Sequence, residues 1–501
     1  MTKLRTPPTD PGQLAVAPAP GDAPSRHVVV PGADCFSFQS LRHRATPRKE
    51  RYALGRRLRK KVTRSELGLW RPPDDRVDPI ALIKRSHQGR QDRLIPIRVG
   101  RMIASPYGYL RGAAVVMAAD VARLPATGIM PVICGDAHLG NFGFYASPER
   151  ALVIDLNDFD EAHPGPWEWD LRRLVASIWV AGRQNGSTEA QCRDAVAACV
   201  ANYRAEVRFL ADEPLLERSY QQLDVDRLHE TATEKSLRAE IRRAAKRARR
   251  RTSDRALPRF TIERDGSRHI VVEPPLITRV TAAEAEAIGH GLDNYLTTLA
   301  PHWRRALAGY TLIDIAHKVV GVGSVGLRAY VALLEGSSTD DVVFLQLKEA
   351  RRSVLARHVH GDEPWHPHQG QRVVEYQQAL QTVSDPLLGW TTIGSRQYYV
   401  RQFRNMKGTI PLEGIKAHAL TDYAGIVGHL LAKGHARTSG ASMIAGYAGR
   451  SRTLDKAMCR FAQAYADQTE ADHHALVRAV ARGILPAEPA DASEDASPFR
   501  P

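Results

Sequence analysis

The sequence predicts a mixed α+β protein with two lobes, one rich in helices and one built on a small antiparallel sheet. Two observations predict this fold class. Apolar residues recur at helical spacing over 105–210 and 417–482, which predicts long helices that pack together. Residues 310–403 instead contain short apolar runs separated by glycine-containing turns, a pattern typical of strands. We therefore expect the helical segments to form one lobe and the strands the other.

Composition divides the 501-residue chain into five segments. Enrichment in Pro and Ala predicts a disordered leader over 1–40 and a disordered tail over 486–501. Between them we expect a helix-rich lobe over 41–305 and a sheet lobe over 306–408. The helices of 409–485 are then expected to pack on the helix-rich lobe.

The overall composition constrains compartment and partners. A formal net charge of +15 favours anionic partners, without distinguishing nucleotides, nucleic acids and acidic membranes. The sequence has no apolar run of about 18 residues, so we expect no membrane span. The N-terminus lacks an apolar signal segment and the five cysteines form no CxxC pair, so we expect a cytoplasmic protein without a disulfide framework.

The segment 134–170 is the first that carries recognisable chemistry. In its polar loop Asn141 follows Asp136 by five positions, the interval of the kinase catalytic loop, where Asp orients an attacking hydroxyl and Asn holds a metal. An apolar strand then leads into three closely spaced aspartates, Asp155, Asp158 and Asp160. Aspartates also cap helices and begin turns, but three carboxylates this close together repel one another. A bound Mg²⁺, which prefers oxygen ligands, would offset that repulsion and so explains the cluster better. We expect Asn141 and these aspartates to supply the metal ligands.

The second informative segment is rich in glycine and leads to a lysine. Gly321, Gly323 and Gly326 match G-x-G-x-x-G, with Ser324 inside the motif. In a dinucleotide-binding fold such glycines open a helix, whereas in a kinase-type loop they cover phosphates and the next strand carries a lysine. Here the following residues look extended, and an apolar strand ends at Lys348, whose ammonium needs an anionic partner. The kinase-type interpretation therefore fits better.

A helix is expected to supply the partner of this lysine. The segment 370–381 has helical spacing and carries Glu375 near its middle, so we expect Glu375 to hold Lys348. Glu349 is closer in sequence, but it follows Lys348 on the strand and so points to the opposite face.

Other local predictions rest on shorter patterns. Residues 94–101 read as a strand and 105–124 as one amphipathic helix. Arg111, near the head of this helix, is either an anion contact or a surface charge. Asp170 is a candidate N-cap for the helix that follows it, and in kinase-like proteins an Asp in this region also braces the catalytic loop.

Taken together, the motifs resemble a bacterial family called domain of unknown function 2252. The resemblance extends from Arg48 to Ala481, and it is carried by YLRGAA, CGDAHLGNFG, DLNDFDEAHPGPWEWDLRRL, KVVGVGSVGLRAYVALLEG and FLQLKEAR. The resemblance to this family implies no particular reaction.

CGDAHLGNFG followed by VIDLNDFDEA is also similar to the aminoglycoside phosphotransferase branch of kinase-like folds, which has an H-G-D-x-H-x-x-N loop and a strand ending in I-D. This resemblance implies that Asp136 is the catalytic base, with His138 beside it in the loop. It also implies that Asn141 is a metal ligand. The metal-binding aspartate is then Asp155 by its position after the strand, or a later aspartate if the chain loops back.

The sequence departs from that branch in two respects. Cys134 stands where the branch has its leading His, which leaves the bracing of the loop open. Kinase-like chains also place the glycine loop and its lysine before the catalytic loop, whereas here Lys348 follows Asp136. The resemblance therefore implies a circularly permuted kinase-like fold, unless one of the two motifs is misread.

The leading hypothesis from the sequence is an ATP- and Mg²⁺-dependent phosphotransferase that acts on a hydroxyl of an unidentified small molecule or protein. A nucleotide-binding regulator without transfer activity and a nucleotidyl transferase on the same fold are alternatives. A metal-dependent phosphoesterase fits less well because the sequence lacks the further His ligands that it needs. Nucleic-acid binding through the basic segments is not favoured.

Overall fold

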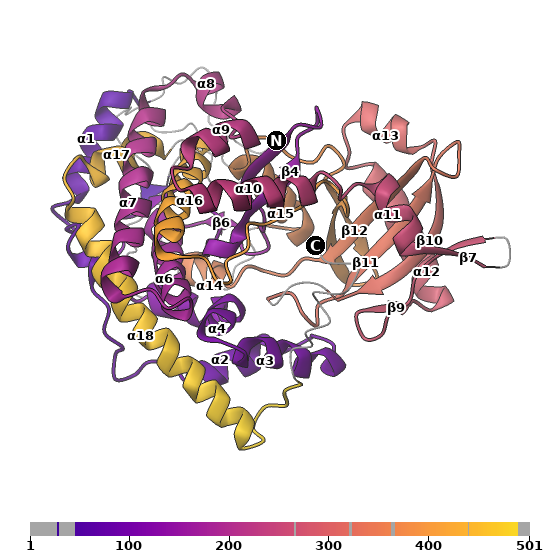
Figure 1. The fold of residues 1–501 in the computed structure, drawn as a ribbon, viewed down its shortest axis with the longest axis horizontal. Coiled ribbons are helices and arrows are strands. Elements are labelled where there is room, and N and C mark those ends of the chain that lie inside the picture. Colours follow the sequence, from indigo (N-terminus) through magenta and orange to yellow (C-terminus); the bar gives the residue numbers. More distant parts are fainter. Residues whose placement is uncertain are drawn as a thin grey trace, which may run out of the picture.

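The computed structural model describes residues 28–29, 46–264, 267–319, 323–361, 366–438 and 440–488. A lobe of helices, on the left of Figure 1, is joined to a lobe built on a six-stranded sheet, on the right. The predicted α+β class is therefore confirmed. The predicted leader and tail lie outside the described residues, except for 486–488 and for β1 (Val28–Val29), which pairs with β2 (Ile129–Met130).

Four helices form the centre of the helical lobe: α6 (Trp167–Gln184), α7 (Glu189–Asp212), α16 (Ala417–Arg437) and α18 (Thr453–Ala481). α7 begins with a capping box, in which Thr188 and Gln191 exchange hydrogen bonds between side chain and backbone. α6 is buried along most of its length because the other three helices pack around it. α7 and α16 approach closely, since any side chain at Gly428 would collide with the Cys199 carbonyl.

Shorter helices surround this centre: α1 (Arg48–Leu58), α2 (Pro79–Ser86), α3 (Ile95–Ile103), α4 (Pro106–Gly112), α5 (Ala114–Val121), α8 (Leu215–Tyr220), α9 (Val225–Thr231), α10 (Lys235–Ala248) and α17 (Ala441–Ala448). The strand predicted over 94–101 is wrong, because this segment forms α3 with Pro96 in its first turn, where proline favours a helix. The single helix predicted over 105–124 is interrupted at Ala113, which separates α4 from α5.

The sheet lobe is organised around six antiparallel strands in the spatial order β13, β14, β12, β11, β10, β9. Their bounds are β9 (Ile277–Arg279), β10 (Thr311–Lys318), β11 (Ala329–Glu335), β12 (Val342–Glu349), β13 (Gly389–Ile393) and β14 (Arg396–Gln402). β12 confirms the predicted strand that contains Lys348. The turn between β13 and β14 contains Gly394 at a φ of +59°, a conformation that glycine adopts without strain.

Helices cover both faces of this sheet: α11 (Ser253–Phe260), α12 (Ala282–Leu296) and α13 (Pro301–Leu307). α12 and α13 share an apolar cluster with Leu345 and Leu347 of β12, whereas α11 packs against Phe344. Alternation along β12 therefore sends Lys348 to the α11 face and Glu349 to the other, as predicted. The sequence placed the start of this lobe at residue 306, whereas α11, β9 and α12 precede that residue and pack with the sheet.

Short strands in the helical lobe hold two polar loops: β3 (Val132–Ile133), β4 (Phe142–Ala146), β5 (Leu152–Leu156) and β6 (His163–Pro164). The loop 134–141, here called the Asp136 loop, runs from β3 to β4. The loop 157–162, here called the Asp160 loop, runs from β5 to β6. Because β3 pairs with β6 and β4 pairs with β5, the two loops lie side by side.

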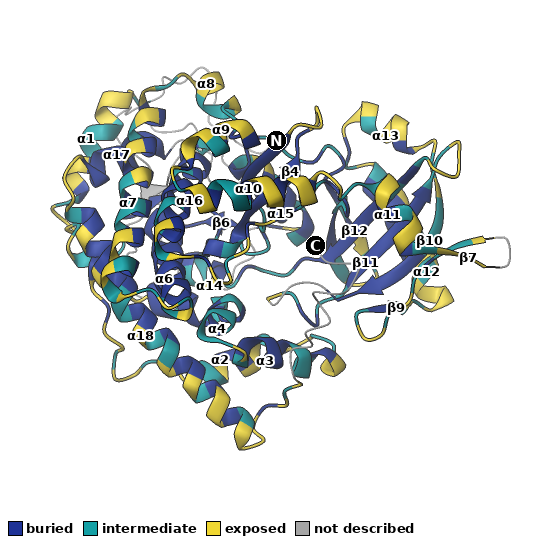
Figure 2. Ribbon diagram, viewed as in Figure 1, coloured by how far each residue is buried: buried dark blue, intermediate teal, exposed yellow. Residues whose placement is uncertain are grey.

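The lobes are joined through α14 (Ala356–His360), α15 (Gln369–Leu380) and the segment after β14. α15 packs against β13 and β14 on one side and against α16 on the other. Gly408 then returns the chain to the helical lobe and exchanges backbone hydrogen bonds of 2.6 and 3.1 Å with Phe144. Buried residues run through both lobes and across this connection (Figure 2).

Within the described ranges, no helix combines the length and the apolar character that crossing a lipid bilayer requires.

The strands β7 (Thr261–Arg264) and β8 (Ser267–Ile270) form an antiparallel hairpin, which extends from the sheet lobe next to α11.

Candidate functional site between the two lobes

The backbone of the Asp136 loop is held by a buried carboxylate on α6. Both oxygens of Asp170 accept backbone N–H bonds, from Cys134 at 2.7 Å and from Gly135 at 2.8 Å. The N-cap interpretation of Asp170 is wrong, because α6 begins at Trp167 and its N-cap is Pro166. Asp170 instead braces the loop, the second role that the sequence suggested.

This brace continues into the core of the helical lobe. His435 of α16 is fully buried, and its Nε2 lies 3.2 Å from Asp170. Tyr203 of α7 lies 2.8 Å from the other ring nitrogen of His435. Cys134 takes part as well, since its Sγ donates to the Asp158 carbonyl at 3.2 Å. The loop is thus firmly held although Cys134 replaces the expected His.

Asp136 lies in this loop with one oxygen paired and the side chain still 21% exposed. The guanidinium of Arg173, one turn after Asp170 on α6, contacts Oδ1 of Asp136 at 2.6 Å. Burial raises the pKa of Asp136 to about 6, and the nearby Asp158 adds to this effect while Arg173 opposes it. The sequence analysis did not single out Arg173. The feature that could have identified it is an arginine within a largely apolar helix, where a buried charge needs an anionic partner.

His138 and Asn141 have different surroundings in the same loop. His138 is 7% exposed and its Nε2 lies 4.0 Å from Asp136. Burial, with Arg111 and Arg173 nearby, lowers the pKa of His138 well below its usual value, so the ring is neutral at pH 7. The amide nitrogen of Asn141 donates to the carbonyls of Asp136 at 3.1 Å and Asp158 at 3.3 Å. Asn141 therefore ties the two polar loops together.

The three predicted metal-binding aspartates are separated. Asp155 is buried on β5, where Oδ2 accepts bonds from the backbone and hydroxyl of Thr382. Asp160 accepts from Tyr399 at 2.8 Å and is bound by Lys348. Asp158 lies between Asp136 and Asp160 along the loops, and burial together with the Asp160 charge raises the pKa of Asp158. Asp160 thus contacts the sheet lobe, and Asp158 lies close enough to Lys348 and Arg401 to feel their charges.

The sheet lobe reaches this acidic loop through Lys348 and the glycine-rich segment. Lys348 Nζ lies 3.0 Å from Oδ2 of Asp160, and Ser324 Oγ donates to the same oxygen at 3.0 Å. Burial would lower the pKa of Lys348, but Asp160 raises it above its usual value, so the pair is ionised. Gly323 and Gly326 belong to the same turn, and Gly326 has a φ of +89°. Gly321 lies outside the described residues.

Glu375 is placed away from the role predicted for it. Its carboxylate accepts a 2.7 Å hydrogen bond from Gln371, whereas the carboxylate that binds Lys348 belongs to Asp160. The residue of α15 that reaches the Asp160 loop is Arg372, which is 1% exposed and donates to the Asp160 carbonyl at 2.7 Å. An arginine inside an amphipathic helix was the signal that sequence reasoning did not use.

Two further basic residues of the sheet side, Arg401 and Lys407, lie near this contact. Arg401 of β14 lies over the Tyr399 ring at 5.6 Å from its centroid, and Lys348 lies over the same ring at 5.2 Å. Burial lowers the pKa of Lys407, and the charges of Arg401 and Lys348 lower it further. Lys348 and Arg401 therefore concentrate positive charge opposite the acidic loops, which favours an anionic ligand.

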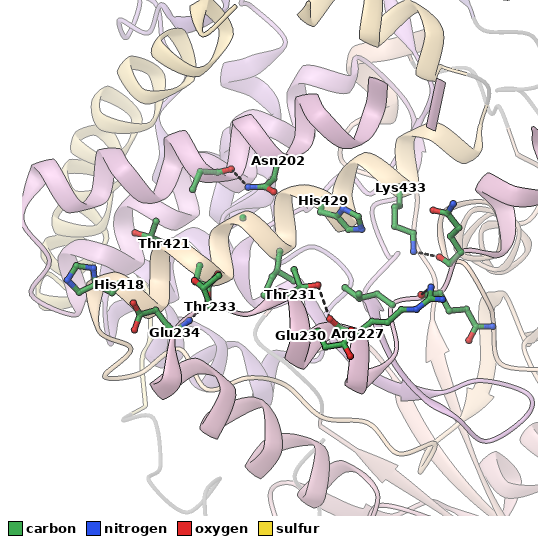
Figure 3. A pocket seen from close by; sticks show the side chains of 17 residues that line it. Asn202, Arg227, Glu230, Thr231, Thr233, Glu234, His418, Thr421, His429 and Lys433 are labelled. Carbon is green, nitrogen blue, oxygen red and sulfur yellow. Dashed lines mark hydrogen bonds between the residues drawn. The ribbon is translucent and has the colours of Figure 1, made fainter. Parts of the chain in front are cut away.

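The described residues contain no group of three or more His, Cys, Asp or Glu side chains arranged to hold a metal ion. A separate cavity of about 890 Å³ lies in the helical lobe among α7, α9 and α16, with Arg227, His429 and Lys433 among its lining residues (Figure 3). None of the site residues predicted from the sequence lines this cavity.

The fold and site define a two-lobed α+β protein whose acidic loops and strand lysine meet where the lobes join. The chain matches, over residues 90–479, the model of a family described as an uncharacterized protein conserved in bacteria (DUF2252), and it belongs to that family. No curated protein and no solved structure matches the chain. The family resemblance is thus confirmed, whereas these comparisons give no support to a similarity with kinase-like folds.

Proposed function

We propose that the protein is an ATP- and Mg²⁺-dependent phosphotransferase that acts on a hydroxyl group. One observation carries the proposal: Lys348 and Ser324 of the sheet lobe both contact Asp160, beside the Asp136 loop of the helical lobe. These segments are far apart in sequence, and each has residues suited to phosphate or metal chemistry. Their meeting supports a shared phosphate-binding site.

Asp136 is the proposed general base. A base must be ionised at the working pH and must reach the proton that it accepts. Asp136 meets both conditions, since its pKa is about 6 and its side chain is 21% exposed beside the Arg173 contact. Arg173 fixes the orientation of the carboxylate, and Asp170 fixes the loop that carries it.

The proposed role of the sheet lobe is to bind the phosphates of the nucleotide. Phosphoryl transfer depends mainly on positioning and on neutralising the charge of the phosphate oxygens. Lys348 and Arg401 supply that charge, while Ser324 and the glycine turn at 323–326 offer hydroxyl and backbone donors. Glu375 has no part in this proposal, because Asp160 takes the position next to Lys348.

Asp158 is the proposed metal-binding carboxylate, with Asn141 and Asp160 beside it. Mg²⁺ typically binds one or two protein carboxylates and completes its shell with water and phosphate oxygens, so it does not need three protein ligands. Burial raises the pKa of Asp158 and the charge of the nearby Asp160 raises it further, so a cation bound between these two carboxylates would offset their repulsion. When bound, Mg²⁺ would supply neutralisation of phosphate charge.

On this proposal the fold is kinase-like with a permuted chain order. The glycine-rich segment and Lys348 follow the Asp136 loop in sequence, but chemistry depends on where the groups meet in space. The contact of Lys348 with Asp160 is compatible with that order.

The test is substitution of the base. Asp136→Asn should lower turnover of γ-labelled ATP in the presence of Mg²⁺ by about 100-fold or more, because general bases typically contribute 10²- to 10⁴-fold. ATP affinity, measured by calorimetry, should change by less than about threefold, since binding and base catalysis are separate. Asp467→Asn, at a side chain that is 62% exposed, is the matched control. Equal turnover in the two variants would reject Asp136 as the base.

Comparing ATP labelled on the α-phosphate with ATP labelled on the γ-phosphate distinguishes phosphoryl transfer from nucleotidyl transfer. Transfer from α-labelled ATP with release of pyrophosphate would identify a nucleotidyl transferase. ATP binding without turnover under any condition would identify a nucleotide-binding regulator, and absence of ATP binding would end the proposal.

A further inference from the structure

Two polar groups near Asp136 are buried without a hydrogen-bond partner in the described part of the chain. They are Nε of Arg111, on α4, and Nδ1 of His138, in the Asp136 loop. Burying a nitrogen of this kind without a partner costs free energy, and such groups normally find an acceptor in protein, water or ligand. Nε of Arg111 can only donate, and Nδ1 of His138 donates in the neutral tautomer that carries its proton there. With that tautomer, both nitrogens can serve an acceptor that the chain itself does not provide.

Two neighbouring polar side chains, Arg173 and Tyr107, already have protein partners. Arg173 is paired with Asp136 and also donates to the Leu110 carbonyl at 2.7 Å. The hydroxyl oxygen of Tyr107 accepts the Gly140 N–H at 2.9 Å, which leaves its own hydrogen to donate elsewhere. The buried Nε of Arg111, by contrast, has no hydrogen-bond partner among the described residues.

Arg111 also lies against the glycine-rich segment. A Cβ built on Gly323 would lie 3.8 Å from the Arg111 carbonyl oxygen, so the C-terminal end of α4 and the glycine turn are neighbours. The positive charge of Arg111 acts on Asp136 and on His138, which places the guanidinium close to both. Arg111 thus stands between the proposed base and the proposed phosphate-binding turn.

We propose that Arg111 and His138 form an oxyanion-binding subsite beside Asp136 that takes a phosphate group, with the Tyr107 hydroxyl as a third donor. A guanidinium and an imidazole N–H both donate and complement phosphate oxygens. The inference rests on the proposed function for the origin of the phosphate, which is either the transferred group of the nucleotide or a phosphate on the acceptor.

The experiment uses inorganic phosphate as the probe, with the full-length chain at constant ionic strength so that screening does not vary. Calorimetry should show saturable phosphate binding to the native protein. Arg111→Met should weaken this binding by about 10- to 100-fold, the range of one hydrogen bond to a charged group. Arg242→Met, at an exposed position of α10, is the matched control and should bind phosphate as the native protein does.

A second variant keeps the test decisive if Arg111→Met does not fold. His138→Phe keeps a ring of similar size, and loss of its donor should weaken phosphate binding by about 5- to 10-fold. Absence of phosphate binding to the native protein, or native affinity in both variants, would overturn the subsite.

Competition with ATP identifies the source of the phosphate. Exclusion of phosphate by ATP with Mg²⁺ assigns the subsite to the nucleotide, whereas simultaneous binding assigns it to the acceptor. The two proposals can fail separately. If phosphate binding depends on Arg111 but the protein does not bind ATP, the subsite is supported and the phosphotransferase proposal is rejected. If the protein turns over ATP but phosphate binding does not depend on Arg111, the phosphotransferase proposal is supported and the subsite is rejected.

Discussion

The acidic loops and the glycine-rich segment meet at one site, but they are held in different ways. The Asp136 loop is fixed by buried side chains of the helical lobe, namely Asp170 and Arg173 of α6. The glycine turn is held through its backbone, since Gln91 donates to the Gly326 carbonyl at 2.8 Å and Arg90 donates to the Val325 carbonyl at 2.5 Å. Its side-chain contact with the acidic loops is Ser324 with Asp160.

This difference separates a rigid part of the site from an adaptable part. Charged hydrogen bonds inside a packed core fix the direction of a carboxylate, which general-base chemistry requires. A turn of small residues held by backbone bonds can follow the shape of a ligand at lower cost. We therefore expect changes in the Asp136 loop to affect stability and turnover, and changes near Lys348 to affect ligand affinity.

The largest effect is expected from removing the brace of the rigid part. Asp170→Ala leaves the N–H groups of Cys134 and Gly135 without their acceptor, and each unsatisfied group costs about 1–3 kcal/mol. The free energy of unfolding should therefore fall by about 2–5 kcal/mol, measured by urea denaturation. Asp467→Ala, at a largely exposed carboxylate, should change it by less than about 1 kcal/mol. Similar values for the two variants would contradict the difference drawn between the regions.

A smaller effect, chiefly on affinity, is expected at the adaptable part. Lys348→Met removes the charge that faces Asp160 and should weaken ATP binding by about 10- to 100-fold, because it removes a charge-assisted contact. The matched control is Glu375→Gln, which should bind ATP within about twofold of the native protein because Gln371, rather than Lys348, contacts Glu375. Calorimetry compares the two, and a larger loss at Glu375 would restore the pairing predicted from the sequence.

The smallest effect concerns the protonation of Asp136. Because only the ionised carboxylate accepts a proton, kcat/KM should rise with pH up to about 6 and fall about tenfold per unit below it. Stability should change in the opposite direction. A folded pKa above the unfolded value near 4 means that the contribution of Asp136 to stability is complete below about pH 4 and is lost as pH rises through about 6.

A pH–rate profile and urea denaturation at several pH values, each compared with Asp136→Asn, measure these two trends. An acidic limb centred near pH 4 would show that the environment of Asp136 does not raise its pKa.

Much of the fold was predictable because local patterns dictate local structure. The apolar run before Lys348 predicted a strand, and the structure has β12 there. The glycine-containing turns expected between the strands of 310–403 include the one at Gly394, between β13 and β14. Both predictions depend on neighbours in sequence. The failure at α3 has a local cause as well. Ile95, Val99, Met102 and Ile103 recur at helical spacing, and Pro96 lies in the first turn, where proline favours the start of a helix.

The sequence identified many of the residues of the candidate site, but it did not identify which of them contact one another. Residue type and spacing singled out Asp136, Asp160, Ser324 and Lys348. The structure brings Ser324 and Lys348 into contact with Asp160, whose loop lies beside that of Asp136. The same reasoning assigned Glu375 to Lys348 because kinase-type sites take that partner from a helix. It grouped Asp155 with Asp158 because they are near in sequence, although a strand and its following loop can face different directions.

By itself, the sequence determined the two chemical segments and the family to which the chain belongs, since these depend on residue type and order. Only the tertiary structure decided that Asp160 receives Lys348, that Asp170 braces the loop and that Arg173 orients Asp136. Each of these contacts joins residues between 35 and 188 positions apart. Spacing along a chain constrains only near neighbours, whereas such pairs form when buried charges must find partners within a packed core.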